Sequence, residues 1–111
     1  MAGVVHIPWY ATVFRGDRLA AALSEIAPVA FRYGATRFQI HRSLDDQYRF
    51  THMVWFESKR DWERYWEGPE MSAFRARTSG WYQVPVLYVW HDEVAAGEAA
   101  PEEAPVAAAT A

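Results

Sequence analysis

The hydrophobic pattern divides the chain into segments with the periodicity of strands and segments with the periodicity of helices. Four segments have the alternating, β-branched and aromatic composition of strands, and they cover residues 9–15, 35–43, 47–57 and 84–94. Pro8 is expected only at the beginning of the first strand or at a bulge, because proline cannot donate to a ladder. Leu44, Asp45 and Asp46 are turn residues, so the second and third strands are predicted to form a hairpin.

Apolar residues recur at helical spacing between the first two strands. Asp17 is predicted to cap a helix over residues 18–34, and Gly34 is predicted to end it. Pro28 lies inside this stretch and lacks the N–H that an α-helix interior requires. We therefore expect the helix to be kinked at Pro28 or to end early.

A second helical stretch follows the hairpin. Ser58 is a favourable N-cap, and the apolar residues after it keep helical spacing. Gly68 and Pro69 interrupt this pattern before a further helical piece, which is predicted over residues 70–78. The complete order is strand, helix, strand, strand, helix, strand. It predicts an α+β protein with a ferredoxin-like βαββαβ antiparallel sheet and helices on one face.

The third strand predicts what lies on each face of this sheet, because successive side chains of a strand point to opposite faces. One set consists of Tyr48, Phe50, His52, Val54 and Phe56, and the other of Thr51, Met53 and Trp55. Both sets are largely apolar, whereas the chain has no spare element to cover the second face. The expected solution is a twofold homodimer in which two sheets pack face to face.

Composition limits the class of protein. The chain has 111 residues, a hydrophobic fraction of 51% and no cysteine, which suits one globular domain without disulfides or thiolate metal sites. The start MAGVVHIPWYATVF does not have the pattern of a signal peptide, and no apolar run approaches the length of a membrane span. We therefore expect a cytoplasmic protein with no membrane partner.

The acidic balance comes from the end of the chain. Residues 95–111 are rich in Ala, Pro and Glu and contain no base, whereas residues 1–94 hold 11 acids and 11 bases. We expect a folded domain over residues 1–94 and a disordered tail over residues 95–111. A neutral domain with an acidic tail is poorly suited to bind phosphate, so no nucleic-acid partner is expected.

Aromatic residues form a stripe on the second predicted helix. Trp62, Tyr65 and Trp66 stand at positions i, i+3 and i+4 and face inward, either as core packing or as the roof of a cavity. Beneath this stripe, His52 is the only polar group of its strand face, with Trp9, Ala11 and Val13 beside it on the first strand. His52 is either a core histidine with a bonded neighbour or a base of lowered pKa that accepts a proton near pH 7.

The chain also resembles a known superfamily. Gly34, the hairpin with Asp45 and Asp46, and the stretch RFTHMVWFESKRDWERYWEGPEMSAF are similar to the dimeric α+β barrel proteins that include the antibiotic biosynthesis monooxygenases. The resemblance spans residues 9–94. It implies a dimer with a ligand cavity between helices and sheet in each subunit. Members include cofactor-free oxygenases of polyketide phenols, haem-degrading monooxygenases and lactone isomerases.

The resemblance also assigns candidate site residues. In the phenol-oxygenating members an Asn and a Trp stand four apart on the third strand, and here these positions are His52 and Phe56. The haem-degrading members have an iron-ligating histidine near the position of Phe74 or Arg75, so haem is not expected. Arg75 is instead either a surface residue or a group that holds a phenolate or carboxylate.

Other cofactor sites are not predicted. His6, His41 and His91 do not have the spacing of metal ligands, and the chain has no glycine-rich phosphate loop. We expect neither a metal nor an organic cofactor.

The resulting hypothesis is a cofactor-independent monooxygenase that oxidises an aromatic or polyketide-like phenol in an apolar cavity. His52 is expected to accept the phenolic proton and Arg75 to stabilise the anion. The residues expected to position the small aromatic molecule are Trp9, Phe56, Trp62 and Trp66. The alternatives are a non-catalytic ligand-binding or structural dimer and a cofactor-free isomerase.

Overall fold

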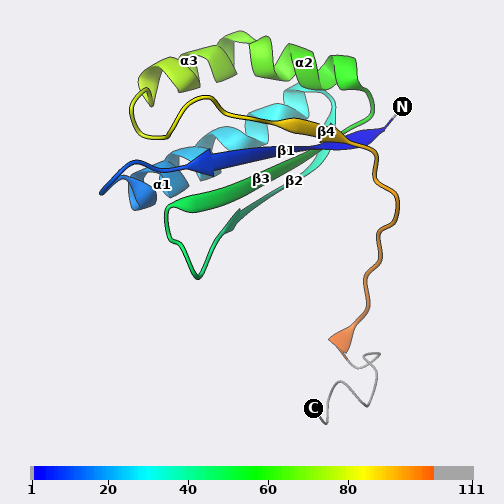
Figure 1. Cartoon of the computed structure of the whole chain (residues 1–111). Helices are drawn as coiled ribbons and strands as arrows, with labels where there is room; N and C mark the ends of the chain where they lie inside the picture. Colours follow the sequence, from blue (N-terminus) through cyan, green and yellow to red (C-terminus); the bar gives the residue numbers. More distant parts are fainter. Residues whose placement is uncertain (1, 102–111) are drawn as a thin grey trace.

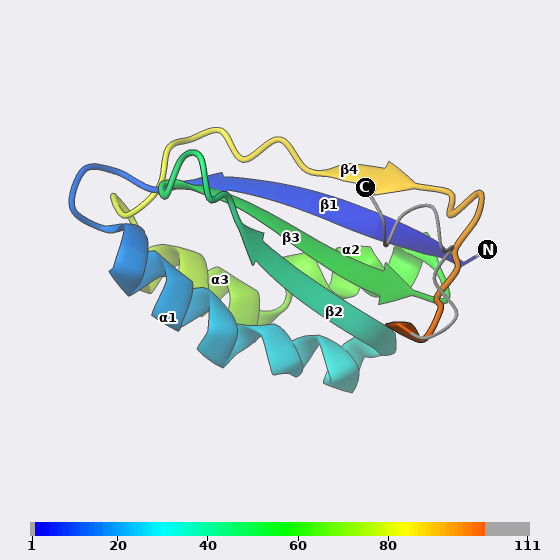
Figure 2. The same ribbon diagram turned by 90° about the horizontal axis from the view of Figure 1, so that it is seen from below.

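The computed structural model describes residues 2–101. The helices and strands are β1 (Gly3–Tyr10), α1 (Gly16–Ile26), the 3₁₀ helix η1 (Ala27–Tyr33), β2 (Ala35–Arg42), β3 (Arg49–Phe56), α2 (Lys59–Glu67), α3 (Pro69–Arg77) and β4 (Val89–His91). The four strands form one antiparallel sheet in the order β2-β3-β1-β4. All helices cover the same face of this sheet, and no helix of residues 2–101 covers the other face (Figures 1 and 2). The predicted α+β, ferredoxin-like architecture is confirmed.

The first strand lies earlier in the chain than the sequence pattern predicted. β1 pairs with β3 along its whole length, from Gly3 opposite Phe56 to Tyr10 opposite Arg49. The prediction of a strand over residues 9–15 was therefore wrong. Pairing with the distant strand β3 determines where β1 lies. Residues 11–15 are apolar in part but form a turn, in which Phe14 has a φ of 69° and is 92% exposed.

Pro8 lies inside β1 without breaking a ladder. The carbonyl of Tyr10 accepts from the amide of Gln83, on the side of β1 where β4 lies. Pro8 is two residues before Tyr10, so its backbone nitrogen faces the same side. β4 pairs with β1 only as far as His6, and no ladder donor is required from Pro8.

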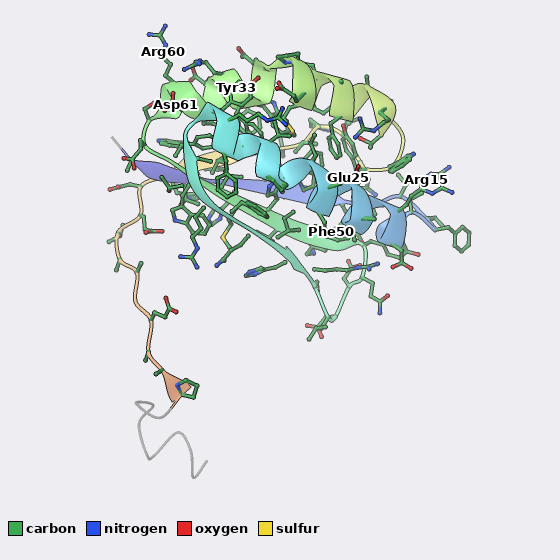
Figure 3. The ribbon with its side chains drawn as sticks, turned by 180° about the vertical axis from the view of Figure 1, so that it is seen from behind. Arg15, Glu25, Tyr33, Phe50, Arg60 and Asp61 are labelled. Carbon is green, nitrogen blue, oxygen red and sulfur yellow. The ribbon has the colours of Figure 1, made fainter. Side chains whose placement is uncertain are left out.

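The hairpin of β2 and β3 is confirmed, and so is the division of β3 between two faces. The inward side chains Phe50, His52, Val54 and Phe56 are each at most 1% exposed. Figure 3 shows Phe50 beneath α1. The outward set, Thr51, Met53 and Trp55, is partly or fully exposed.

The outer face is more polar than β3 alone indicated. On neighbouring strands, Gln39 and His6 lie beside Met53, His41 lies beside Thr51, and His91 lies beside Val4. The face therefore combines apolar side chains with three of the four histidines of the chain. The homodimer remains a prediction.

The first helix starts and ends for reasons that differ in part from the sequence prediction. Arg15 is at the N-cap of α1, and Asp17 does not cap it; the Asp17 carboxylate accepts a hydrogen bond from Arg42 of β2 at 2.8 Å. The α-helix ends at Ile26, and Pro28 is in the first turn of η1, as expected for an early end. Gly34, with a φ of 94°, closes η1 in the left-handed conformation.

The second helical stretch agrees with the sequence prediction. The Ser58 hydroxyl accepts from the amide of Asp61 at 3.2 Å and caps α2. The helix is broken at Gly68, and α3 begins at Pro69. The charged residues of α2 other than Asp61 are exposed, and Arg60 points away from the sheet (Figure 3).

The last strand is much shorter than residues 84–94. Tyr82 forms a bridge with Ala11 and β4 pairs with residues 4–6, but the segment between them, residues 84–88, does not join the sheet. Pro85 lies in this segment and has no N–H for a ladder. After His91 the chain leaves the sheet on the side opposite the helices (Figure 1). Part of the predicted disordered tail, residues 102–111, lies outside the described residues.

Candidate functional site

The candidate site is built around His52, on the inner face of β3. Its neighbours across the sheet are Ile7 on β1 and Ile40 on β2. The side chain is fully buried, and this burial lowers the pKa of His52 to about 4. The imidazole is therefore neutral at pH 7.

One hydrogen bond determines which nitrogen of His52 carries the proton. The indole Nε1 of Trp9 donates to Nδ1 of His52 at 3.3 Å, within the buried core. An indole N–H can only donate, so Nδ1 must carry the lone pair and Nε2 must carry the hydrogen of the neutral ring. Nε2 is buried and has no hydrogen-bond partner among the described residues.

The four aromatic residues expected to position a ligand belong to one connected cluster. The ring of Trp66 lies 5.9 Å from that of Trp9 and 5.2 Å from that of Trp62. The ring of Phe56 lies 6.2 Å from that of Trp62. The structure thus brings Trp9 from β1, Phe56 from β3 and two tryptophans from α2 to the same layer. Val13, expected beside them, is instead 63% exposed, because β1 ends before it.

Arg75 lies at the edge of this cluster. Its guanidinium stacks over the ring of Trp66 at 4.2 Å, and its Nη1 donates to the carbonyl of Trp66 at 2.9 Å. The side chain is half-buried. No ion pair joins Arg75 to a carboxylate within residues 2–101. Its charge is thus available to an anion that reaches this layer.

Tyr65 is a polar member of the site that the sequence did not identify. The inward spacing of Tyr65 on α2 predicted its burial, and the residue is fully buried. Its hydroxyl, like Nε2 of His52, has no partner among the described residues. Burial raises the pKa of Tyr65, and the nearby charge of Arg75 acts in the opposite direction. Periodicity indicates that a tyrosine faces inward, but it does not indicate whether its hydroxyl finds a partner.

The site is closed in this structure. His52, Trp9, Phe56 and Trp62 are each at most 1% exposed. Three hollows of about 270, 330 and 350 Å³ lie on the molecule. None of these three is lined by His52, Trp9 or Trp62, although Phe56 contributes to the last of them. A ligand can contact His52 only if part of its cover moves.

Tyr88 is part of this cover. Its ring lies 5.0 Å from that of Trp62 and 5.3 Å from that of Trp66. Tyr88 belongs to residues 84–88, which are outside the sheet and include the exposed side chains of Val84 and Leu87. This segment is the part of the cover with the fewest buried side chains.

Metal-binding groups do not gather in the described part of the chain. His6 and His91 have ring centroids 4.3 Å apart on the outer face of the sheet. Within residues 2–101, no group of three or more histidine or carboxylate side chains is placed to hold a metal ion. No helix in this range is long and apolar enough to cross a membrane.

Comparisons with known proteins give structural likeness only. No family model matches the sequence, and no curated protein matches it. A protein from Nitrosomonas europaea described as a "putative antibiotic biosynthesis monooxygenase" superimposes with a TM-score of 0.76 at 19% identity, over 84% of this chain and 90% of that chain. A protein from Bordetella bronchiseptica with the same description gives a TM-score of 0.75 at 16% identity, over 85% and 98%.

A third similar structure extends the comparison. Rv0793 from Mycobacterium tuberculosis has a TM-score of 0.75 at 13% identity, and the match covers 88% of this chain and all of that one. The matches span nearly the whole domain but share few residues. This chain therefore has the ferredoxin-like α+β fold of the antibiotic biosynthesis monooxygenase-like structures, as the sequence resemblance implied.

Proposed function

We propose that this protein is a cofactor-independent monooxygenase that oxidises an aromatic or polyketide-like phenol between the helices and the sheet. The observation that carries the proposal is the polar Nε2 of His52, left without a partner inside an aromatic layer. Buried polar groups without partners are uncommon in native proteins and often mark a ligand position. The structural likeness to proteins described as antibiotic biosynthesis monooxygenases gives additional support.

The proposed reaction needs no external reductant, because the substrate supplies the electrons. A ring carbon of the phenolate forms a bond to dioxygen, and the resulting peroxide anion takes up the proton that the phenol had released, which gives a hydroperoxide. Loss of water from this hydroperoxide breaks the O–O bond and leaves a quinone. The protein contributes orientation, electrostatic stabilisation and exclusion of water.

Each site residue has a role in this proposal. His52 contacts the phenolic oxygen, and Arg75 stabilises negative charge on the substrate. The aromatic walls that hold the ring are Trp9, Phe56, Trp62 and Trp66. Because these walls are closed, we propose that residues 84–88 move aside with Tyr88 when the substrate enters.

A homodimer is part of the proposal. The outer face carries the partly exposed side chains of Trp55 and Met53 without a covering element in the described chain. Packing of this face against a second copy would remove its apolar side chains from water. The charged groups of the face would lie at the rim or pair across the seam.

A non-catalytic ligand-binding protein is the second candidate, and the low pKa of His52 favours it. A histidine with a pKa of about 4 is a weak proton acceptor at pH 7, whereas binding does not require it to titrate. A cofactor-free isomerase that uses His52 as its base is disfavoured by the same observation.

Oxygen consumption separates the oxygenase from the binding protein. We expect purified protein to consume oxygen with an electron-rich polycyclic phenol such as a dihydroxynaphthalene, above the rate of autoxidation. His52→Phe should lower this rate by about 10²-fold or more if the imidazole contacts the reacting oxygen. Ligand binding without oxygen uptake across a panel of phenols and hydroxyquinones would exclude the oxygenase and leave the binding protein.

A further inference from the structure

We propose that His52 is a hydrogen-bond donor held in one tautomer by Trp9, and that Tyr65 is a second neutral donor of the same buried core. The ligand that this pair recognises carries an acceptor oxygen: a carbonyl, an enolate or a phenolate. His52 therefore does not accept the substrate proton. The inference rests on the site of the proposed function, but it does not depend on oxidation.

The first step is the position of the proton on His52. Trp9 and His52 lie on neighbouring strands, and the indole N–H points to Nδ1 at 3.3 Å. For Nε2 to accept a proton from a ligand, its own hydrogen would have to move to Nδ1. Two hydrogens would then face each other between Trp9 and His52, and the buried hydrogen bond would be lost. The paired strands fix this arrangement. The Nε2 hydrogen is therefore the polar atom of the ring that remains for a ligand.

The second step is the absence of a base among the groups around it. Apart from the aromatic hydroxyls, the buried polar side chains of the described residues are His52 and Thr78, and the Thr78 hydroxyl already donates to the carbonyl of Phe74. The charged group of α3 that acts on Tyr65 is Arg75, a cation that lies over the ring of Trp66. Carboxylates on the helices, such as Asp61 and Glu70, are bonded to Arg64 and Tyr33. The layer thus offers donors and positive charge to a ligand.

The third step is the hydroxyl of Tyr65. Burial raises its pKa, so the phenol stays protonated at neutral pH. The hydroxyl is buried without a partner, as Nε2 of His52 is, and Tyr65 belongs to the same core cluster as Trp9, which holds His52. A ligand oxygen that accepts from either group gives a partner to a buried donor that otherwise has none. Negative charge on that oxygen strengthens the hydrogen bond.

This arrangement changes what the site selects. A neutral phenol oxygen is a weaker acceptor than a phenolate, and a phenol that binds as the anion must lose its proton to solvent, since His52 does not take it. A group that is already anionic or carbonyl-like meets the donors directly. The pH dependence of binding should then follow the ionisation of the ligand and not that of His52.

The tautomer can be measured without any ligand. In ¹⁵N-detected NMR of histidine-labelled protein, we expect His52 to show a protonated Nε2 and an unprotonated Nδ1 from pH 5.5 to 8.5. Trp9→Phe should abolish this single pattern, because Nδ1 loses its donor. Trp90→Phe is the matched control, since Trp90 packs against the same core but does not donate to His52. A protonated Nδ1 in the native protein, or titration of His52 within this range, would overturn the proposal.

The ligand class is tested with two probes of similar shape. We expect 2-hydroxy-1,4-naphthoquinone, an anion at neutral pH, to bind more tightly than 2-methylnaphthalene, which has no oxygen. His52→Phe should weaken binding of the quinone by about tenfold, whereas His52→Gln, which keeps an N–H donor, should weaken it less. Equal affinity of both probes for the native protein, or no difference between the two variants, would contradict donor recognition.

These results also separate the two proposals. The expected tautomer together with quinone binding but no oxygen uptake would exclude the oxygenase and support the donor role. Oxygen uptake together with a protonated Nδ1 would support the oxygenase and exclude the donor role.

Discussion

The indole N–H of Trp9 donates to Nδ1 of His52 across the boundary between β1 and β3, at 3.3 Å. This contact joins residues 43 positions apart in the chain and leaves Nε2 of His52 as the nitrogen that carries the hydrogen. It makes the chemistry of the site depend on the pairing of the first and third strands.

The stability of the protein should depend on pH through His52. Its pKa is lowered from 6.5 to about 4 by burial, so the folded state favours the neutral ring more strongly than the unfolded state does. The free energy of unfolding should be highest above pH 6.5, where His52 is neutral in both states. It should fall by roughly 3 kcal/mol as the pH decreases from 6.5 through about 4. Urea unfolding from pH 4 to 8 measures it. His52→Phe should flatten the slope between pH 4 and 6.5, and an unchanged slope would show that His52 is not the titrating group.

Tyr65→Phe should separate stability from binding. The substitution removes a buried hydroxyl without a partner, so the free energy of unfolding should stay the same or rise by about 1 kcal/mol. Affinity for a hydroxynaphthoquinone anion should fall. Thermal melting and isothermal titration measure the two effects. Tyr33→Phe is the control, because the Tyr33 hydroxyl already donates to Glu70. A large loss of stability in Tyr65→Phe would mean that its hydroxyl has a partner in solution.

Arg75→Ala should weaken the binding of anions more than that of neutral aromatics. The guanidinium lies over the ring of Trp66 and has no carboxylate partner within residues 2–101. Loss of its charge should lower anion affinity by about tenfold, with a smaller effect at high salt. Arg77→Ala is a matched control on the same helix, where the guanidinium lies over Phe74 at 5.6 Å. Equal effects of both substitutions would place Arg75 outside the site.

The protein should be a dimer at micromolar concentration. Light scattering should give twice the 12.8 kDa mass of one chain, with Met53 and Trp55 at or near the seam. Trp55→Glu should shift the mass toward that of one chain, because it would place a charge in the buried seam. Arg60→Glu should not, since Arg60 points away from the sheet (Figure 3). A native mass of 12.8 kDa would exclude the dimer.

Deletion of residues 95–111 should leave the melting temperature unchanged within about 1 °C. Residues 95–99 are exposed and form no helix or strand, so they bury little apolar area that could stabilise the fold. Calorimetry of the truncated and full chains tests this. A fall of several degrees would show that the tail docks on the domain.

The local sequence was sufficient to predict the parts of the fold that depend on residues close together in the chain. The hairpin of β2 and β3, the Ser58 cap and the break at Gly68 depend on residues a few positions apart, and each was predicted. Alternation along β3 likewise predicted that His52 and Phe56 face inward. Helical spacing predicted the inward faces of Trp62 and Tyr65.

Only the tertiary structure decided the features that depend on distant partners. β1 begins at Gly3 because it pairs with β3, and Asp17 bonds to Arg42 instead of capping its helix. Arg75 reaches Trp66 across the break between two helices. The position of the proton on His52 and the lack of a partner for the Tyr65 hydroxyl have the same cause. Periodicity determines which way a side chain points, whereas the packing of separate elements determines which polar atoms it meets.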